Sequence, residues 1–131
     1  MSLFKNVCKV IFSLSFIAGL PQQQAAAAES VAVGTASFYA ERFHGRRTAS
    51  GERYNMHGMT AATGRAHYPL GTLVRVTNLS NQRSVELRVN DRGPLPRGRI
   101  LDVSKRAATE LGFLQAGLAR VKVEVLDWGG A

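Results

Sequence analysis

Cysteine is almost missing from this sequence, in which Cys8 is the single example among 131 residues. That residue lies in the first 28 positions, whose composition differs from that of the rest of the chain. The domain that we place at residues 29–131 therefore contains none, which excludes a disulfide framework and a cysteine nucleophile. Its fold must rest on one small hydrophobic core, and any catalysis must use other side chains.

Long hydrophobic runs are also missing, apart from one near the N-terminus. There, Lys5 and Lys9 precede an apolar run over residues 10–20, and four alanines follow at 25–28. This pattern predicts a secretory signal peptide over residues 1–28 with an A-x-A cleavage site, and the run is too short for an ordinary membrane span. The residues before the cysteine are charged and polar, whereas a bacterial lipoprotein signal has small apolar residues there. We expect a periplasmic or secreted monomer that is not a lipoprotein and has no stable membrane anchor.

Negative charge is scarce in this chain. It has 17 lysines and arginines against 9 aspartates and glutamates, a formal net charge of +8, and removal of Lys5 and Lys9 with the signal peptide leaves +6. A basic surface either indicates an anionic partner or serves solubility alone. We expect no nucleic-acid partner, because the chain has an export signal and lacks a helix-turn-helix spacing, an aromatic RNA-binding signature and a zinc-finger pattern. For an exported bacterial protein the nearer anionic polymer is the cell wall.

Several catalytic and cofactor motifs are absent as well. The sequence has no Gly-x-Ser-x-Gly elbow, and no glycine-rich phosphate loop stands between a predicted strand and a helix. Three histidines occur, His44, His57 and His67, but their spacing fits no helical or hairpin pattern of metal ligands. We therefore expect no metal site and no cofactor.

What the mature domain does contain is a series of short segments with the alternating pattern of half-buried strands. We predict strands at 31–40, 72–79, 84–90, 100–103 and 120–126, and a helix that begins after Ser104 and ends at Gly112. Gly34 interrupts the first strand, which indicates a kink or a close backbone approach. The polar segment 41–58 is long enough to be a functional loop. Many short strands with one small helix favour a mainly β fold, a closed barrel, over a layered α/β fold.

Asp91 stands at the end of a strongly alternating segment. Val85, Leu87 and Val89 alternate with polar residues, and Gly93-Pro94 then ends the strand. A rigid sheet can hold such a carboxylate toward a cleft. The same residue could instead bond to its own turn, and the segment alone leaves both interpretations open.

Short motifs along the mature domain occur in the order seen in a known family. They are Gly34–Tyr39, Phe43–Gly45, Thr48–Glu52, Met59–Ala62, Pro69–Thr72, Val74–Leu79, Val89–Pro94 and Asp102–Ser104. Through them the chain resembles the rare lipoprotein A family. The resemblance implies a six-stranded double-psi β-barrel with one or two short helices over residues 29–131, related to the barrel of expansins. Many members also carry a lipid-modified cysteine and a C-terminal peptidoglycan-binding repeat, and we expect neither here.

The resemblance further implies an activity, endolytic lytic transglycosylation of peptidoglycan glycan strands. The bond from N-acetylmuramic acid to N-acetylglucosamine is cleaved without water, and the 6-hydroxyl closes a 1,6-anhydro end. Asp91 matches the family's catalytic aspartate, and Glu52 matches the glutamate that faces it across the cleft. We expect Asp91 to serve as acid and then as base, while Glu52 raises its pKa by like-charge proximity or stabilises the cation.

The family's active-site histidine is not where the motif places it. It usually follows the Thr-Ala-Ala motif directly, whereas Thr63 stands at that position here and the segment to Pro69 is longer. His67 lies in this longer segment, from which it could reach the same space. We expect His67 to be helpful or dispensable, since a histidine on a polar loop is more often solvated than catalytic.

The residues predicted to bind substrate surround these positions. They are His67, Tyr39, Asn90, Arg92 and Thr60. The aromatic residues Tyr39, Phe43 and Tyr54 form either a platform on which a sugar stacks or a part of the core.

The sequence therefore leaves two functions open. The first is an enzyme that cuts peptidoglycan glycan strands, and both Asp91 and Glu52 favour it. The second is a non-catalytic wall-binding or wall-loosening module of the expansin type, which the missing histidine favours. Both functions have peptidoglycan glycan strands as the partner.

Overall fold

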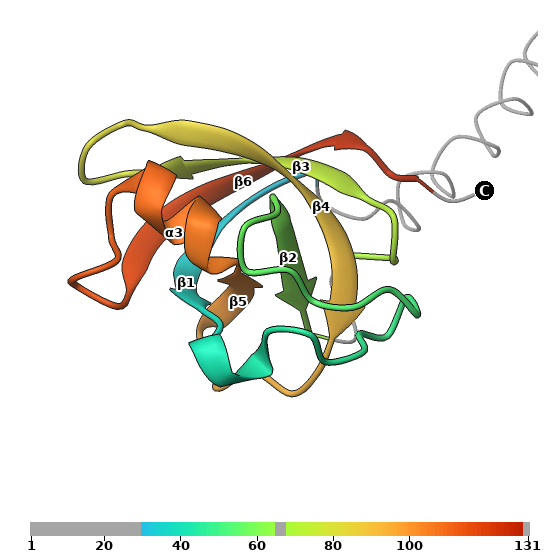
Figure 1. Cartoon of the computed structure of the whole chain (residues 1–131). Helices are drawn as coiled ribbons and strands as arrows, with labels where there is room; N and C mark the ends of the chain where they lie inside the picture. Colours follow the sequence, from blue (N-terminus) through green and yellow to red (C-terminus); the bar gives the residue numbers. More distant parts are fainter. Residues whose placement is uncertain (1–29, 65–67, 130–131) are drawn as a thin grey trace, which may run out of the picture.

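Six strands form a closed barrel. The computed structural model describes residues 30–64 and 68–129. The strands are β1 (Val31–Phe38), β2 (Thr60–Thr63), β3 (Leu73–Asn78), β4 (Ser84–Arg92), β5 (Arg99–Val103) and β6 (Ala119–Asp127). They neighbour one another in the order β1-β5-β2-β4-β3-β6, and β6 returns to β1 (Figure 1). The predicted mainly β, six-stranded barrel is confirmed.

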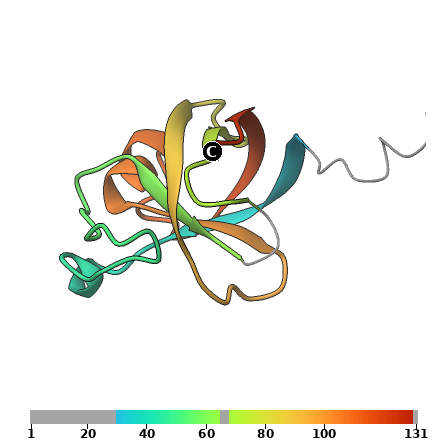
Figure 2. The same ribbon diagram turned by 90° about the vertical axis from the view of Figure 1, so that its right-hand side faces the viewer.

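Parallel and antiparallel pairs are mixed in this barrel. The pairs β1 with β5 and β2 with β4 are parallel, and the other neighbours are antiparallel. The hairpin of β3 and β4 agrees with the sequence prediction. A long loop joins β1 to β2 and projects from one side of the barrel (Figure 2). This loop passes the end of β4, where the backbone amide of Ser50 donates to the carbonyl of Asn90 at 3.1 Å.

The core lies inside the barrel and follows the alternation of the strands. The regular parts of the strands send every second side chain inward, and many of these residues are fully buried. They include Val74, Val76, Leu87, Val89, Leu101, Val103, Val121 and Val123. Burying them supplies most of the favourable free energy of folding, in a domain whose described part has no cysteine.

Strand β2 was not predicted from periodicity. Its four residues, Thr-Ala-Ala-Thr, are too short to show alternation, and alanine is not a typical strand residue. Pairing on both sides explains why it forms, because Ala61 lies between Val89 of β4 and Val103 of β5. The backbone hydrogen bonds to both neighbours, rather than the side chains, therefore define this strand.

The predicted helix is α3 (Lys105–Leu111), and it lies against β4 and β1. The Ser104 side chain caps it by accepting from the amide of Ala107 at 3.1 Å, and Gly112 ends it with a left-handed φ of 80°. Both signals were identified in the sequence and are confirmed. The long loop adds a single 3-10 turn, η2 (Glu41–Phe43), which an ion pair between Glu41 and Lys105 joins to α3.

Gly34 marks a close approach, as its place in β1 predicted. A Cβ atom at this position would lie 2.7 Å from the Cγ2 atom of Ile100. The β1–β5 register shifts at the same point, since Thr35 pairs with Arg99 and Ala36 pairs with Leu101. Ile100 is therefore an extra residue in β5, and only glycine leaves space for it.

Two sequence predictions concern residues that the structure does not describe. They are the signal peptide over residues 1–28 and the site role of His67. Within residues 30–64 and 68–129, no helix is long and apolar enough to cross a membrane.

Candidate active site

Asp91 accepts three hydrogen bonds at the end of β4. The hydroxyl of Tyr39 donates to its Oδ2 atom at 2.6 Å, and the backbone amides of Ala49 and Arg92 donate to Oδ1, each at 2.9 Å. Burial and the hydrogen bond to Asp91 raise the pKa of Tyr39 far above its usual range, so this hydroxyl keeps its proton. The half-buried carboxylate is thus held in one orientation by β1, β4 and the long loop.

A bulge in β4 brings Asp91 to the surface. In the pairing with β2, Ala61 lies opposite Val89 but Ala62 lies opposite Asp91, so Asn90 is the extra residue. Strict alternation would place Asp91 on the same face as the buried Val89, inside the core. The extra residue turns Asp91 to the outer face beside Ala62, which is a known role of bulges at functional sites.

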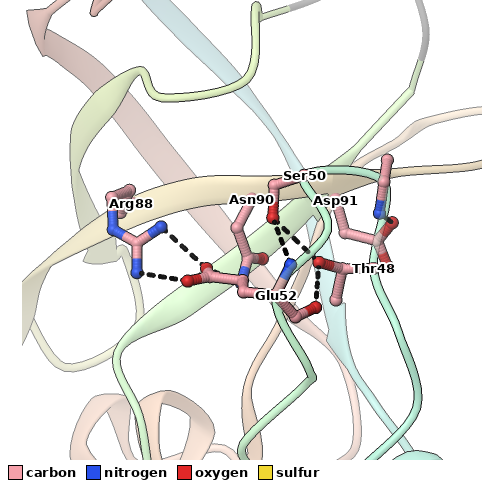
Figure 3. A network of polar contacts seen from close by, with 7 residues as sticks. Thr48, Ser50, Glu52, Arg88, Asn90 and Asp91 are labelled. Carbon is pink, nitrogen blue, oxygen red and sulfur yellow. Dashed lines mark hydrogen bonds and ion pairs between the residues drawn. The ribbon is translucent and has the colours of Figure 1, made fainter.

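Glu52 lies on the long loop and is bound to the same strand (Figure 3). Its carboxylate accepts from Arg88 at 2.8 and 3.4 Å and from the Asn90 side chain at 2.6 Å. These hydrogen bonds, first that of Arg88 and then that of Asn90, lower the pKa of Glu52. A turn closed by the bond from the Thr48 amide to the Glu52 carbonyl, at 2.9 Å, fixes the loop beside β4.

Asp91 and Glu52 line two different hollows, each of about 300 Å³. Residues around the Asp91 hollow include Tyr39, Phe43, Ala62, Arg92, Leu95 and Asp102. Residues around the Glu52 hollow include Asn55, Met59, Thr60, Arg88 and Asn90. Among the described residues, the two acidic side chains therefore line separate hollows, and the bulge at Asn90 and Asp91 adjoins both of them.

The predicted substrate-binding residues divide between these hollows. Tyr39 and Arg92 lie with Asp91, whereas Asn90 and Thr60 lie with Glu52. The structure therefore brings each of these four residues beside one of the two predicted catalytic carboxylates.

Thr63, at the position of the family's histidine, lines neither hollow. Its side chain is fully buried, and its hydroxyl has no hydrogen-bond partner among the described residues. A fully buried position gives no access to substrate. Thr63 therefore does not replace the histidine, and the prediction for His67 lies outside the described residues.

Asp102 is an acidic residue of this site that was not predicted from the sequence. It stands on β5 between the buried residues Leu101 and Val103, lines the Asp91 hollow, and accepts from the Ser37 hydroxyl at 3.0 Å. Burial is the main cause that raises the pKa of Asp102, and the charge of Asp91 adds to the rise. The sequence does contain a signal for this residue. Because side chains alternate along a strand, an aspartate between two buried apolar residues is expected on the outer face of the barrel. The like-charge neighbour of Asp91 is thus Asp102, whereas Arg88 and Asn90 govern the pKa of Glu52.

The aromatic residues serve both of the roles that the sequence left open. Tyr39 stacks on Tyr54 with ring centroids 4.3 Å apart, and Phe43 meets Tyr39 edge to face at 6.1 Å. Tyr54 is buried, and its hydroxyl accepts from the Lys105 amide at 3.1 Å, so it is a packing residue. Tyr39 and Phe43 line the hollow, where their rings can meet a sugar.

Histidines contact each other in this part of the loop without forming a metal site. The rings of His44 and His57 lie 5.8 Å apart, and His44 Nδ1 accepts from the Met56 amide at 3.1 Å. In the described ranges, no three His, Cys, Asp or Glu side chains gather closely enough to hold a metal ion.

Comparison with known proteins decides the family. The family model described as "Lytic transglycolase" matches residues 31–123, which is most of the barrel. The chain belongs to this family. Proteins named endolytic peptidoglycan transglycosylase RlpA are similar to it, at 55% identity over 95 residues in Pseudomonas aeruginosa and 54% over 97 residues in Neisseria meningitidis. These names agree with the resemblance to the rare lipoprotein A family.

The matched regions cover a larger share of this chain than of the relatives. The match with the Pseudomonas protein covers 72% of this chain and 27% of that protein. The match with the Neisseria protein covers 74% of this chain and 40% of that protein. The chain thus spans well under half the length of these curated relatives. The relatives' names describe whole proteins of which this barrel matches one part.

Solved structures show the same fold at low sequence identity. The Streptomyces papain inhibitor matches with a TM-score of 0.61 at 22% identity, over 75% of this chain and 96% of that one. An expansin of Clavibacter michiganensis matches with a TM-score of 0.60 at 22% identity, over 77% of this chain and 52% of that one. The barrel is therefore of the double-psi type.

Proposed function

We propose that this protein is a lytic transglycosylase that cuts peptidoglycan glycan strands between N-acetylmuramic acid and N-acetylglucosamine. The observation that carries the proposal is Asp91, which a bulge turns outward and three donors hold at an open hollow. The family and the names of the curated relatives support the same reaction.

The reaction needs proton transfer but no water. As the glycosidic bond breaks, the leaving oxygen takes up a proton, and positive charge develops on the sugar ring. The 6-hydroxyl of the same muramic acid then attacks its own C1 atom and loses a proton, which gives the 1,6-anhydro end. Asp91 is the group that exchanges protons with the substrate in this proposal. Its fixed orientation lowers the entropic cost of reaching the reactive geometry.

The neighbouring residues bind the glycan strand in this proposal. Tyr39 and Arg92 contact the sugar in the Asp91 hollow, and Asn90 and Thr60 contact the next sugar in the Glu52 hollow. Glu52 has a different role from Asp91 in this proposal. Its charge is paired with Arg88, which supports a role for Glu52 in holding the loop and the sugar. The ion pair gives no support to the alternative that Glu52 raises the pKa of Asp91.

The setting of the reaction is also a proposal. We propose that the protein acts as a soluble monomer in the periplasm or outside the cell after its signal peptide is removed. The basic composition and the N-terminal pattern of residues 1–28 support this.

A second candidate function is a non-catalytic, expansin-like module that binds or loosens the wall. The observation in its favour is the fold, since a mutant of the Clavibacter expansin was solved in complex with cellohexaose and has a TM-score of 0.60 to this barrel. In that case the hollow holds the polymer and breaks no bond.

Mass spectrometry of purified sacculi incubated with the protein separates the two functions. We expect soluble fragments with 1,6-anhydro-muramic ends from the parent, and a loss of about 10²–10⁴-fold with Asp91→Asn. The variant should fold, because Asn keeps an oxygen for the two backbone amides and can donate to the Tyr39 oxygen instead of accepting. Reducing ends would indicate a hydrolase, and unchanged glycans with pelleted protein would indicate the binding module. Parent-level release by Asp91→Asn would overturn the role of Asp91.

A further inference from the structure

Two carboxyl groups flank Ala62 on the outer face of the barrel. Ala62 of β2 pairs with Asp91 of β4 on one side and with Asp102 of β5 on the other. Neighbouring strands lie ~4.8 Å apart, so the two aspartate Cα atoms lie about 10 Å from each other. All three residues line the same hollow. Because the side chain between the aspartates is only a methyl group, a sugar ring can enter above it.

The surroundings of Asp91 suit a proton acceptor. Both of its oxygens already accept hydrogen bonds, one from the Tyr39 hydroxyl and the other from the amides of Ala49 and Arg92. Toward all three of these groups Asp91 acts as a hydrogen-bond acceptor, which is the role that a base has toward the proton it removes. The arrangement therefore fixes the orientation of Asp91 as an acceptor group in the hollow.

The surroundings of Asp102 suit a proton donor. Arg99 donates to the Ser37 hydroxyl at 3.2 Å, and this hydroxyl donates to Oδ1 of Asp102 at 3.0 Å. The Oδ2 atom of Asp102 accepts a hydrogen bond from no described residue. It is not a buried atom without a partner, because in the described ranges only the Thr63 hydroxyl is one. The Oδ2 atom is therefore accessible from the hollow that Asp102 lines. A proton on Asp102 therefore sits on Oδ2, in the hollow.

The charged and titratable groups around Asp102 come from several elements. Burial and the negative charge of Asp91 raise the pKa of Asp102, whereas the Ser37 hydrogen bond and the charge of Arg99 lower it, and burial is the largest effect. Tyr39 and Tyr54 also face it, and burial raises the pKa of both, so they are neutral. Geometry and charge agree on a carboxyl group that holds a proton more readily than usual.

We propose that Asp102 is a further catalytic residue of this hollow, which protonates the leaving oxygen while Asp91 accepts a proton from the substrate. The proposal rests on the proposed transglycosylase function. The bond from C1 of muramic acid to O4 of glucosamine breaks, and O4 takes the proton of Asp102. The 6-hydroxyl oxygen bonds to C1, and its proton passes to Asp91. Exchange with solvent then returns each carboxyl group to its starting state.

Dependence on the leaving group tests this division of roles. On glycan strands Asp102→Asn should lose about 10²–10⁴-fold in rate, as Asp91→Asn does. On a 4-nitrophenyl glycoside of the muramic sugar, whose leaving group needs no proton, Asp102→Asn should lose less than about 10-fold while Asp91→Asn stays deeply impaired. The matched control is Glu86→Gln, on the exposed side of β4, which should act like the parent. An equal loss for Asp102→Asn on both substrates would overturn the proton-donor role.

The pH–rate profile with glycan strands gives a second test that leaves Asp102 in place. The acid must be protonated, so the rate should fall as pH rises through the pKa of Asp102. Ser37→Ala removes a hydrogen bond that lowers this pKa, so the alkaline limb should move to higher pH. An unmoved limb would contradict the proposal.

Stability measurements test the protonation of Asp102 without any activity. A group whose pKa is raised on folding stabilises the fold below its unfolded pKa of about 3.9, and this contribution is lost as pH rises through the folded pKa. The midpoint of urea unfolding of the parent should therefore fall over that range relative to Asp102→Asn. A constant difference would contradict the proposal. If the parent itself releases no anhydro ends, the proposed function fails, whereas full activity of Asp102→Asn on glycan strands overturns only the role of Asp102.

Discussion

Hydrogen-bond partners distinguish the acidic residues of this barrel more clearly than their positions in the sequence do. Among the described residues, Asp91 accepts only from Tyr39 and two backbone amides, so no positive side chain of this part of the chain neutralises it by direct contact. Glu52 is paired with the Arg88 guanidinium and with Asn90. An ion-paired carboxylate in the adjoining hollow is better suited to holding structure than to proton transfer.

We expect Glu52→Gln and Arg88→Gln to lower activity on glycan strands by similar factors, below about 10-fold. Both break the same half-exposed ion pair, which contributes roughly 1 kcal/mol and holds the loop that presents the Ala49 amide to Asp91. Turnover of sacculi measures this effect. Arg75→Gln is the matched control, because its ion pair with Glu86 is likewise partly exposed.

The same two variants test the alternative role of Glu52. If its negative charge raises the pKa of Asp91, Glu52→Gln alone should move both limbs of the pH–rate profile. A loss with Glu52→Gln as deep as that with Asp91→Asn, and none with Arg88→Gln, would show that Glu52 takes part in the chemistry.

At the scale of elements, the strands that alternate were predictable and the irregular ones were not. The alternating residues of β3, β4 and β6 predicted which side chains are buried, and Ser104 and Gly112 predicted both ends of α3. Strand β2 has no period to detect, because pairing with two neighbours forms it.

The bulge at Asn90 explains why part of the site was missed. Its register shift depends on the partner strand and leaves no mark in a single sequence. The alternation of β4 alone therefore could not show that Asp91 and Asp102 reach the same face. The family motifs predicted Asp91 and Glu52 as the site, but not that they occupy separate hollows.

Thr63→Val should stabilise the fold at the end of β2 by about 1 kcal/mol. The Thr63 hydroxyl is buried without a partner among the described residues, and valine has nearly the same shape without the polar group. The free energy of unfolding in urea measures the change. Thr72→Val is the matched control, since that buried hydroxyl donates to the Pro69 carbonyl at 2.8 Å and its loss should destabilise by about 1 kcal/mol. A marked loss of activity in Thr63→Val would contradict our placement of this residue outside the site.

At the scale of the whole molecule, charge and shape make separate contributions to wall binding. The domain from residue 29 carries a formal charge of +6, whereas each hollow of about 300 Å³ is defined by a few side chains. Charge attracts an anionic polymer over a distance that salt shortens, and contacts within a hollow are much less sensitive to salt. Binding to the wall and cleavage of a glycan strand can therefore be separated by ionic strength.

We expect Asp91→Asn to bind purified sacculi tightly at low salt and progressively less as salt approaches 1 M, where the screening length is only ~3 Å. The inactive variant is used because it leaves the polymer intact during the pelleting assay. Chitin, a neutral polymer with the same N-acetylglucosamine unit, is the control, and any binding to it should change little with salt. Binding to sacculi that persists unchanged in high salt would show that the hollows, rather than the net charge, hold the protein on the wall. That outcome would favour the expansin-like function if the parent also released no anhydro ends.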